Sequence, residues 1–165
     1  AVDGIIYMLA QLSGGVLGAL LTKSLLLDEG RAANYGAATV SPLLAGNFAG
    51  MVVEALGTFA LVLVILAVAM GAKAIKDWAP LAIGLTFGVI GMVFGPLTGA
   101  SVNPARWFGP ALVSGEWGGV WPYLVGPIVG ALLAVAFFKF VIAKGEADAG
   151  GPPIEPPTPA SGGKV

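Results

Sequence analysis

Residues 95–116 read GPLTGASVNPARWFGPALVSGE, a stretch too apolar for an ordinary loop and too often interrupted by Gly and Pro for a membrane span. Asn is a favoured helix N-cap, and Pro is favoured at the first helical position. A helix is therefore predicted to begin at Asn103 and to run through Trp107 toward Leu112. Such a helix is too short to cross a bilayer, which needs about 20 residues.

Helix-breaking residues precede this short helix. Gly95, Pro96 and Gly99 are predicted to end the apolar helix before it and to allow extended backbone. Non-helical backbone at membrane depth is tolerated only where it is buried in protein or lines a water-filled cavity. Arg106 lies one turn past Asn103, so a cavity that holds both groups would bind water and repel cations. The alternative is an ordinary helix after a turn, with Arg106 reaching to an interface.

Long apolar runs flank this stretch on both sides. Of the 165 residues, 57% are hydrophobic and 10% are charged, whereas a soluble domain has roughly a quarter charged residues. Four runs are long enough for the ~30 Å hydrocarbon core: residues 4–22, 48–72, 78–94 and 117–138. Trp117, Trp121 and Tyr123 are predicted to anchor the last run at an interface. The sequence therefore predicts an all-α membrane protein of about four transmembrane helices and one re-entrant half-helix.

Glycines recur at a spacing of four residues in all four predicted spans. Such spacing places small residues on one helix face and lets backbones approach closely in lipid. The pattern therefore favours a tightly packed bundle, although the abundance of Gly would produce some pairs by chance. The pairs are Gly14/Gly18, Gly46/Gly50, Gly84/Gly88, Gly91/Gly95 and Gly126/Gly130.

Basic residues in the short loops predict the orientation. Lys73 and Lys76 lie between the second and third runs, and Lys139 and Lys144 follow the fourth, so these ends are predicted to be cytoplasmic. After the last run the chain becomes rich in Gly and Pro and cannot bury a core. Two regions are predicted: a channel-like membrane domain over 1–143 and a disordered cytoplasmic tail over 144–165.

The composition argues against several classes of protein. Cys and His are absent, which removes disulfides, thiol chemistry and the commonest zinc ligands. A net charge of −1 without a basic cluster gives no support for nucleic-acid binding. No phosphate-binding loop or nucleophile–base pair is visible, so we expect no cofactor, no metal and no enzymatic activity.

Three motifs resemble the second half of the aquaporin, or major intrinsic protein, family. They are GASVNPAR at 99–106, Glu54-Ala55-Leu56-Gly57-Thr58-Phe59 in the second span, and Tyr123-Leu124-Val125-Gly126-Pro127 in the fourth. Their order and spacing cover residues 3–141. The resemblance implies an aquaporin-like right-handed helical bundle that corresponds to family spans three to six, and a homotetramer in the plasma membrane.

The resemblance also implies roles for particular residues. Asn103, in the motif that continues through Pro104 and Ala105, would face the pore, and Arg106 would belong to the selectivity filter with Gly91 and Ala100. The backbone from Gly99 through Ser101 to Val102 would offer carbonyl oxygens to the solute. Glu54 would be a buried acid that holds this loop, with Gln11 a weaker candidate for a similar structural role. The alternative for Glu54 is an acid at the level of the lipid headgroups.

The match departs from the family pattern in one respect. A whole member has two Asn-Pro-Ala motifs, and only one occurs here, so the first two spans and the first half-helix are missing. With no initiator Met, the sequence is expected to start inside a longer protein. We expect that an opposing half-pore must be supplied, and that the isolated chain folds poorly and forms no normal pore.

The leading functional hypothesis is a passive channel for water and small neutral solutes such as glycerol, which excludes protons and ions. Solute selectivity is ambiguous, because Gly91 and Ala100 make a wide filter while Ala111 and Leu124 point to different branches of the family. One alternative is a fragment of an ion-coupled transporter, with Glu54 as the coupling acid. Another is a non-conducting structural or regulatory subunit.

Overall fold

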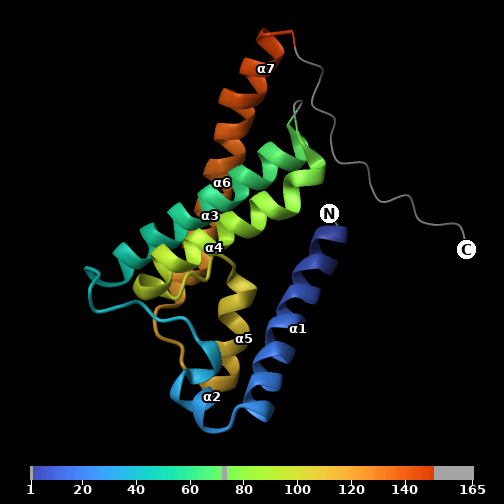
Figure 1. The fold of residues 1–165 in the computed structure, drawn as a ribbon. Coiled ribbons are helices and arrows are strands. Elements are labelled where there is room, and N and C mark those ends of the chain that lie inside the picture. Colours follow the sequence, from blue (N-terminus) through green and yellow to red (C-terminus); the bar gives the residue numbers. More distant parts are fainter. Residues whose placement is uncertain (1, 72–73, 151–165) are drawn as a thin grey trace, which may run out of the picture.

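The computed structural model describes residues 2–71 and 74–150, and this part of the chain is mainly helical (Figure 1). No strand occurs in these two segments. The all-α class predicted from the apolar runs is confirmed. In chain order the elements are α1 (Val2–Leu25), α2 (Asp28–Ala32), η1 (Asn34–Gly36), α3 (Gly46–Met70), η2 (Lys76–Trp78), α4 (Ala79–Thr98), α5 (Pro104–Ser114), α6 (Val120–Phe137), η3 (Phe138–Ala143) and α7 (Lys144–Asp148).

Four helical runs are long and apolar enough to cross a membrane, as predicted. The first, α1, has 24 residues, which corresponds to about 36 Å of helix against a hydrocarbon core of ~30 Å. The short helix α5 is the predicted half-helix, with 11 residues. The four runs are Val2–Leu25, Gly46–Met70, Lys76–Thr98 and Val120–Asp148.

The third span ends later than the sequence predicts. Pro96 lies inside α4, which continues to Thr98, so the prediction that Gly95 and Pro96 break this helix is wrong. A proline removes a single backbone donor, and the amide of Gly99 still donates to the carbonyl of Gly95 at 2.8 Å. The helix ends where Gly99 adopts a left-handed conformation with φ of 77°.

Tyr123 does not act as an interfacial anchor, contrary to the prediction. It is fully buried, whereas Trp117 and Trp121 of the same predicted group are 41% and 70% exposed. The Tyr123 hydroxyl donates to the carbonyl of Thr98 at 2.8 Å. That carbonyl belongs to the last turn of α4, whose carbonyls have no partner within the helix. Tyr123 therefore joins α6 to the end of α4.

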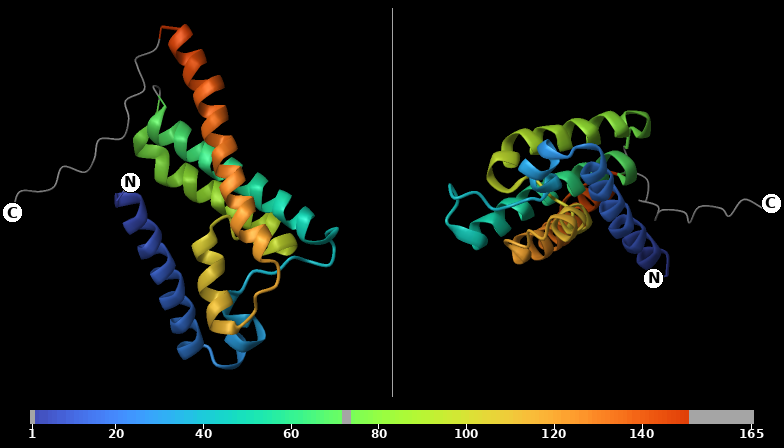
Figure 2. Two further views of the ribbon diagram at one scale, coloured as in Figure 1. Left: turned by 180° about the vertical axis from the view of Figure 1, so that it is seen from behind. Right: turned by 90° about the horizontal axis from the view of Figure 1, so that it is seen from below.

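The fourth span also extends beyond its predicted end. The helix passes from α6 through the π-helical segment η3 into α7 and stops at Asp148, so it includes residues 144–148 of the predicted tail. Figure 2 shows this helix projecting past the neighbouring ends of α3 and α4. Residues 151–165 and Lys73 lie outside the described residues. The division into a membrane domain and a disordered tail stays a prediction.

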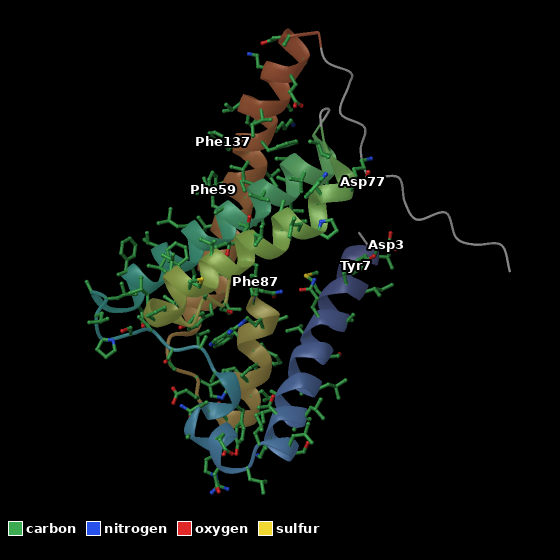
Figure 3. The ribbon with its side chains drawn as sticks, in the orientation of Figure 1. Asp3, Tyr7, Phe59, Asp77, Phe87 and Phe137 are labelled. Carbon is green, nitrogen blue, oxygen red and sulfur yellow. The ribbon has the colours of Figure 1, made fainter. Side chains whose placement is uncertain are left out.

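The helices α3 and α6 cross at close range because α6 carries glycines at the contact. A Cβ at Gly126 would lie 2.8 Å from the carbonyl oxygen of Met51, and one at Gly130 would overlap the carbonyl of Ala55. Further along, the rings of Phe59 and Phe137 meet edge to face, with centroids 6.0 Å apart (Figure 3). This crossing follows the close packing predicted for the Gly126/Gly130 pair.

The other glycine pairs do not pack in the same way. Gly50 lies against Val40, but both members of three predicted pairs have open space where a Cβ would stand. The expected close glycine packing is therefore found between α3 and α6, whereas on the glycine rows of α1 and α4 an added Cβ would meet nothing within 4 Å. The open glycines are Gly14, Gly18, Gly46, Gly84, Gly88, Gly91 and Gly95.

The helix α1 lies alongside α5 (Figures 1 and 2). The contact is close because glycines meet there: a Cβ at Gly15 would stand 2.5 Å from the carbonyl oxygen of Ala105, and Gly109 faces Gly15 in turn. Most other side chains of α1 are exposed, with Ala19 alone buried among those of the helix. The arrangement leaves a space between α1 and α5, where the candidate site lies.

Candidate functional site

The half-helix α5 begins as the sequence predicts. Asn103 has extended backbone angles and is the N-cap, with its Oδ1 accepting from the amide of Ala105 at 2.9 Å. Pro104 occupies the first helical position, where its missing N–H costs nothing. This local hydrogen bond fixes the Asn103 side chain at the positive end of the helix. The two hydrogens of its Nδ2 remain to bind something else.

Glu54 holds the loop that precedes the half-helix. Its side chain is 1% exposed in the middle of α3, and its two carboxylate oxygens accept from successive amides, Ser101 at 3.0 Å and Val102 at 2.6 Å. A buried carboxylate is tolerated only when such donors satisfy it. The Cβ of Glu54 also lies against Gly126 of α6. This is the geometry that the predicted loop-holding role requires.

The loop itself adopts an unusual backbone. Ala100 and Val102 have positive φ angles of 46° and 44°, and Ala100, Ser101 and Val102 are all buried. Their amides point toward Thr98 Oγ1 or the Glu54 carboxylate. In a trans peptide unit the C=O points opposite to the N–H. The carbonyl oxygens of residues 99–101 therefore point away from these two acceptors.

A cavity of about 530 Å³ lies between α1, η1 and α5. Three of the predicted site residues line it: Asn103, Ala105 and Arg106. Gly91 and the loop residues 99–102 do not, and Gly91 is exposed on α4. The structure thus brings together the half-helix residues and leaves the two other predicted filter positions elsewhere. The full lining is Gln11, Gly14, Gly15, Gly18, Ala19, Thr22, Tyr35, Gly36, Asn103, Ala105, Arg106 and Pro110.

Gln11 is the polar partner of Asn103 across this cavity. The Nδ2 of Asn103 donates to Oε1 of Gln11 at 3.1 Å. Around Gln11 the wall formed by α1 is made of small residues, which leaves room beside the amide pair. With Oδ1 engaged by Ala105, one Nδ2 hydrogen of Asn103 is left for a solute.

Arg106 places a positive charge in the same cavity. It is exposed and lies one turn beyond Asn103 on α5. Among residues 2–71 and 74–150 no carboxylate forms an ion pair with its guanidinium. An unneutralised guanidinium beside a donor amide attracts polar neutral molecules and repels cations.

Some residues of this region could not be found from the sequence. Tyr35 and Thr22 line the cavity, and Trp107, a residue of the half-helix itself, stacks on Tyr123 of α6 with ring centroids 5.8 Å apart. Trp107 is 2% exposed, and its Nε1 has no hydrogen-bond partner among the described residues. Nothing in the sequence indicated that Tyr35 would line the cavity.

Comparison with known proteins identifies the family. A family model described as "Major intrinsic protein" matches residues 1–138. The chain belongs to the major intrinsic protein family. The buried Glu54, the Asn-capped half-helix and the four apolar spans are therefore features of a multi-pass membrane protein of this family.

Similar members of the major intrinsic protein family come from plants. "Probable aquaporin TIP2-2" of Oryza sativa subsp. japonica is 39% identical over 87% of this chain and 56% of its own length. "Probable aquaporin TIP3-2" of Arabidopsis thaliana is 41% identical over 86% of this chain and 52% of its own length. "Nodulin-26" of Glycine max is 36% identical over 82% of this chain and 48% of its own length. The chain spans about half the length of the curated relatives it matches.

Proposed function

We propose that the chain forms one half of a passive pore for water and small neutral solutes such as glycerol. The observation that carries the proposal is the cavity in which Asn103 and Arg106 project from one half-helix. A water molecule there meets a donor amide at the positive end of α5, and the adjacent guanidinium repels protons and other cations. No group of three or more potential metal ligands occurs among the described residues, and passive flow needs no cofactor. On the basis of family membership, we propose a channel rather than an enzyme.

An ion-coupled transporter is less well supported. Such a mechanism needs an acid that exchanges ions with the pathway, and Glu54 was the candidate. Both of its carboxylate oxygens are engaged by backbone amides, and it does not line the cavity. For the Glu54 carboxylate to bind an ion, its hydrogen bonds to the loop before α5 would have to break.

The proposed pore also needs an opposing wall. The cavity is lined by α1, η1 and α5, while the glycine row of α4 lies open and takes no part in the lining. We propose that a second half-pore packs against the α4 row, either as another part of a longer polypeptide or as a separate chain. On the basis of family membership, we propose that the chain forms a homotetramer in the plasma membrane. The loop charges favour a cytoplasmic C-terminal end.

The test is osmotic shrinkage of liposomes, followed by stopped-flow light scattering. The chain is reconstituted alone and together with the N-terminal half of the rice relative. We expect shrinkage faster than that of protein-free vesicles when both halves are present. Gly14→Trp should abolish most of the added flux, because Gly14 lines the cavity and has open space for a large ring.

Gly4→Trp is the matched control. Gly4 lies on the same helix with equally open space, but it does not line the cavity, so flux should persist. Flux no faster than that of empty vesicles in every arrangement would reject the channel in favour of a non-conducting subunit. Equal flux in both Trp variants would show that water does not pass through this cavity.

A further inference from the structure

A tyrosine from the loop between α1 and α3 lines the cavity. Tyr35 of η1 lines it together with Gly36, Thr22 and Arg106. The element η1 packs against both α1 and α5, the two helices that form the cavity walls. Tyr35 therefore shares the cavity lining with Arg106 and with residues of both helices that form the walls.

The backbone at Tyr35 has a conformation that tyrosine rarely adopts. Asn34 and Tyr35 have φ angles of 46° and 53°, in the left-handed region. For a bulky residue this is an outlier, and it persists only where the surroundings fix it. Two hydrogen bonds do so locally, from Gly36 to the Ala33 carbonyl at 2.9 Å and from Ala37 to the Asn34 carbonyl at 3.0 Å.

The loop is also anchored after the turn. Ala38 is 3% exposed and belongs to the apolar cluster that includes Trp107 and Tyr123. The amide of Ser41 donates to the carbonyl of Leu97, near the end of α4, at 2.8 Å. These contacts attach the loop to the same framework that positions the half-helix. The turn at Tyr35 is therefore a fixed part of the cavity wall.

The Tyr35 ring packs against α2 and lies near a lysine of α1. A Cβ at Gly30 would lie 3.1 Å from Cδ1 of Tyr35, so the ring packs on bare backbone of α2 that a larger residue would obstruct. The Nζ of Lys23 lies 5.5 Å from the ring centroid, within range of a cation–π interaction. Among the described residues none forms a hydrogen bond with the Tyr35 hydroxyl, which can therefore contact a solute.

We propose that Tyr35 is a further specificity-determining residue, which narrows the mouth of the cavity beyond Arg106 and restricts the passage of polyols more than that of water. The inference rests on the proposed channel function. A fixed ring excludes a solute by size, and glycerol is larger than water. Lys23 contributes by holding the ring through its cation–π contact.

The experiment compares glycerol and water permeability in the same vesicles that conduct water with both half-pores present. Tyr35→Gly removes the ring and suits the left-handed backbone, so the loop can keep its course. We expect the ratio of glycerol to water permeability to rise at least threefold, with water permeability within twofold of the parent. Tyr35→Phe keeps the ring and should stay within 1.5-fold of the parent ratio.

Asn34→Gly is the matched control for loop flexibility, because Asn34 has the same kind of backbone and does not line the cavity. Its ratio should be unchanged. A Tyr35→Gly ratio within 1.5-fold of the parent, in vesicles that still conduct water, would overturn the role of Tyr35 and leave the channel standing. So would an equal rise in Asn34→Gly. Absence of water flux in the parent would reject the channel and the inference with it.

Discussion

At the scale of single residues, Glu54 determines whether the loop before the half-helix keeps its shape. Two consecutive amides donate to the two oxygens of one carboxylate that is 1% exposed. The loop they belong to contains the left-handed residues Ala100 and Val102, which need such support. The placement of Asn103, directly after this loop, follows from the same pair of hydrogen bonds.

Glu54→Gln should destabilise the protein, although the Gln side chain has nearly the same size as the Glu side chain. A Gln side chain has a single acceptor oxygen, so one of the two buried amides faces an NH2 group and loses its partner. An unsatisfied buried donor costs about 1–3 kcal/mol. The free energy of unfolding, measured by tryptophan fluorescence during denaturation in detergent, should fall by about that amount.

The control for this prediction is Glu116→Gln. The Oε1 of Glu116 accepts from the amide of Gly118 at 3.1 Å in an exposed turn, where water replaces a lost bond. Its substitution should change the unfolding free energy by less than about 0.5 kcal/mol, as is usual at the surface. Equal effects of the two substitutions would contradict the role assigned to the Glu54 carboxylate.

At the scale of helices, the closest packing lies where α6 crosses α3. Gly126 and Gly130 leave no room for a Cβ against the backbone of α3. Gly130→Ala should therefore force the two helices apart, and overpacking of this kind costs about 1–3 kcal/mol. Gly88→Ala has open space and should be neutral, or should stabilise α4 by about 0.5–1 kcal/mol, because Ala is the better helix former.

Circular dichroism during denaturation in detergent measures both variants, since the loss of helical signal reports unfolding of the whole chain. A Gly130→Ala variant as stable as the parent would mean that α3 and α6 can move apart without loss of unfolding free energy. A Gly88→Ala variant as damaged as Gly130→Ala would mean that the open row on α4 is occupied in the folded chain.

The spans and the half-helix could be predicted because their signals are local. The length of each apolar run shows which segments can cross a bilayer. Asn103 and Pro104 supply the N-cap and the first helical residue of α5. Gly99, one of the predicted helix breakers, does end α4, but no local signal showed that Pro96 would lie inside the helix. Nor did one show that Tyr123, 25 residues later in the chain, would donate to the Thr98 carbonyl. That contact also turned Tyr123 from an expected interfacial residue into a buried one.

At the scale of the whole molecule, the cavity depends on contacts that no local pattern reveals. Tyr35 reaches it because its loop is fixed through Ala38 and Ser41 to the ends of α4 and α5, in a conformation that tyrosine seldom adopts. Gln11 meets Asn103 because α1 and α5 approach through Gly15 and Gly109. The family motifs predicted Asn103 and Arg106, and tertiary packing added the other residues around them.

The open glycine row on α4 carries the last prediction. Gly84, Gly88, Gly91 and Gly95 follow one another at intervals of four, three and four residues, so they share one helix face, and each has open space. Close helix packing in membranes uses such faces. If the second half-pore packs here, Gly88→Leu should weaken its association with this chain while leaving the fold of the chain intact.

Co-purification measures this association. The chain and the N-terminal half of the rice relative are expressed together, with a tag on this chain, and the amount of untagged partner is compared at equal helical content. We expect Gly88→Leu to reduce the recovered partner at least threefold. Gly145→Leu, at an equally open glycine in α7 near the C-terminal end of the fourth span, should recover the parental amount. Undiminished recovery with Gly88→Leu would place the second half-pore on another face, because a leucine in the contact would hold the two backbones apart.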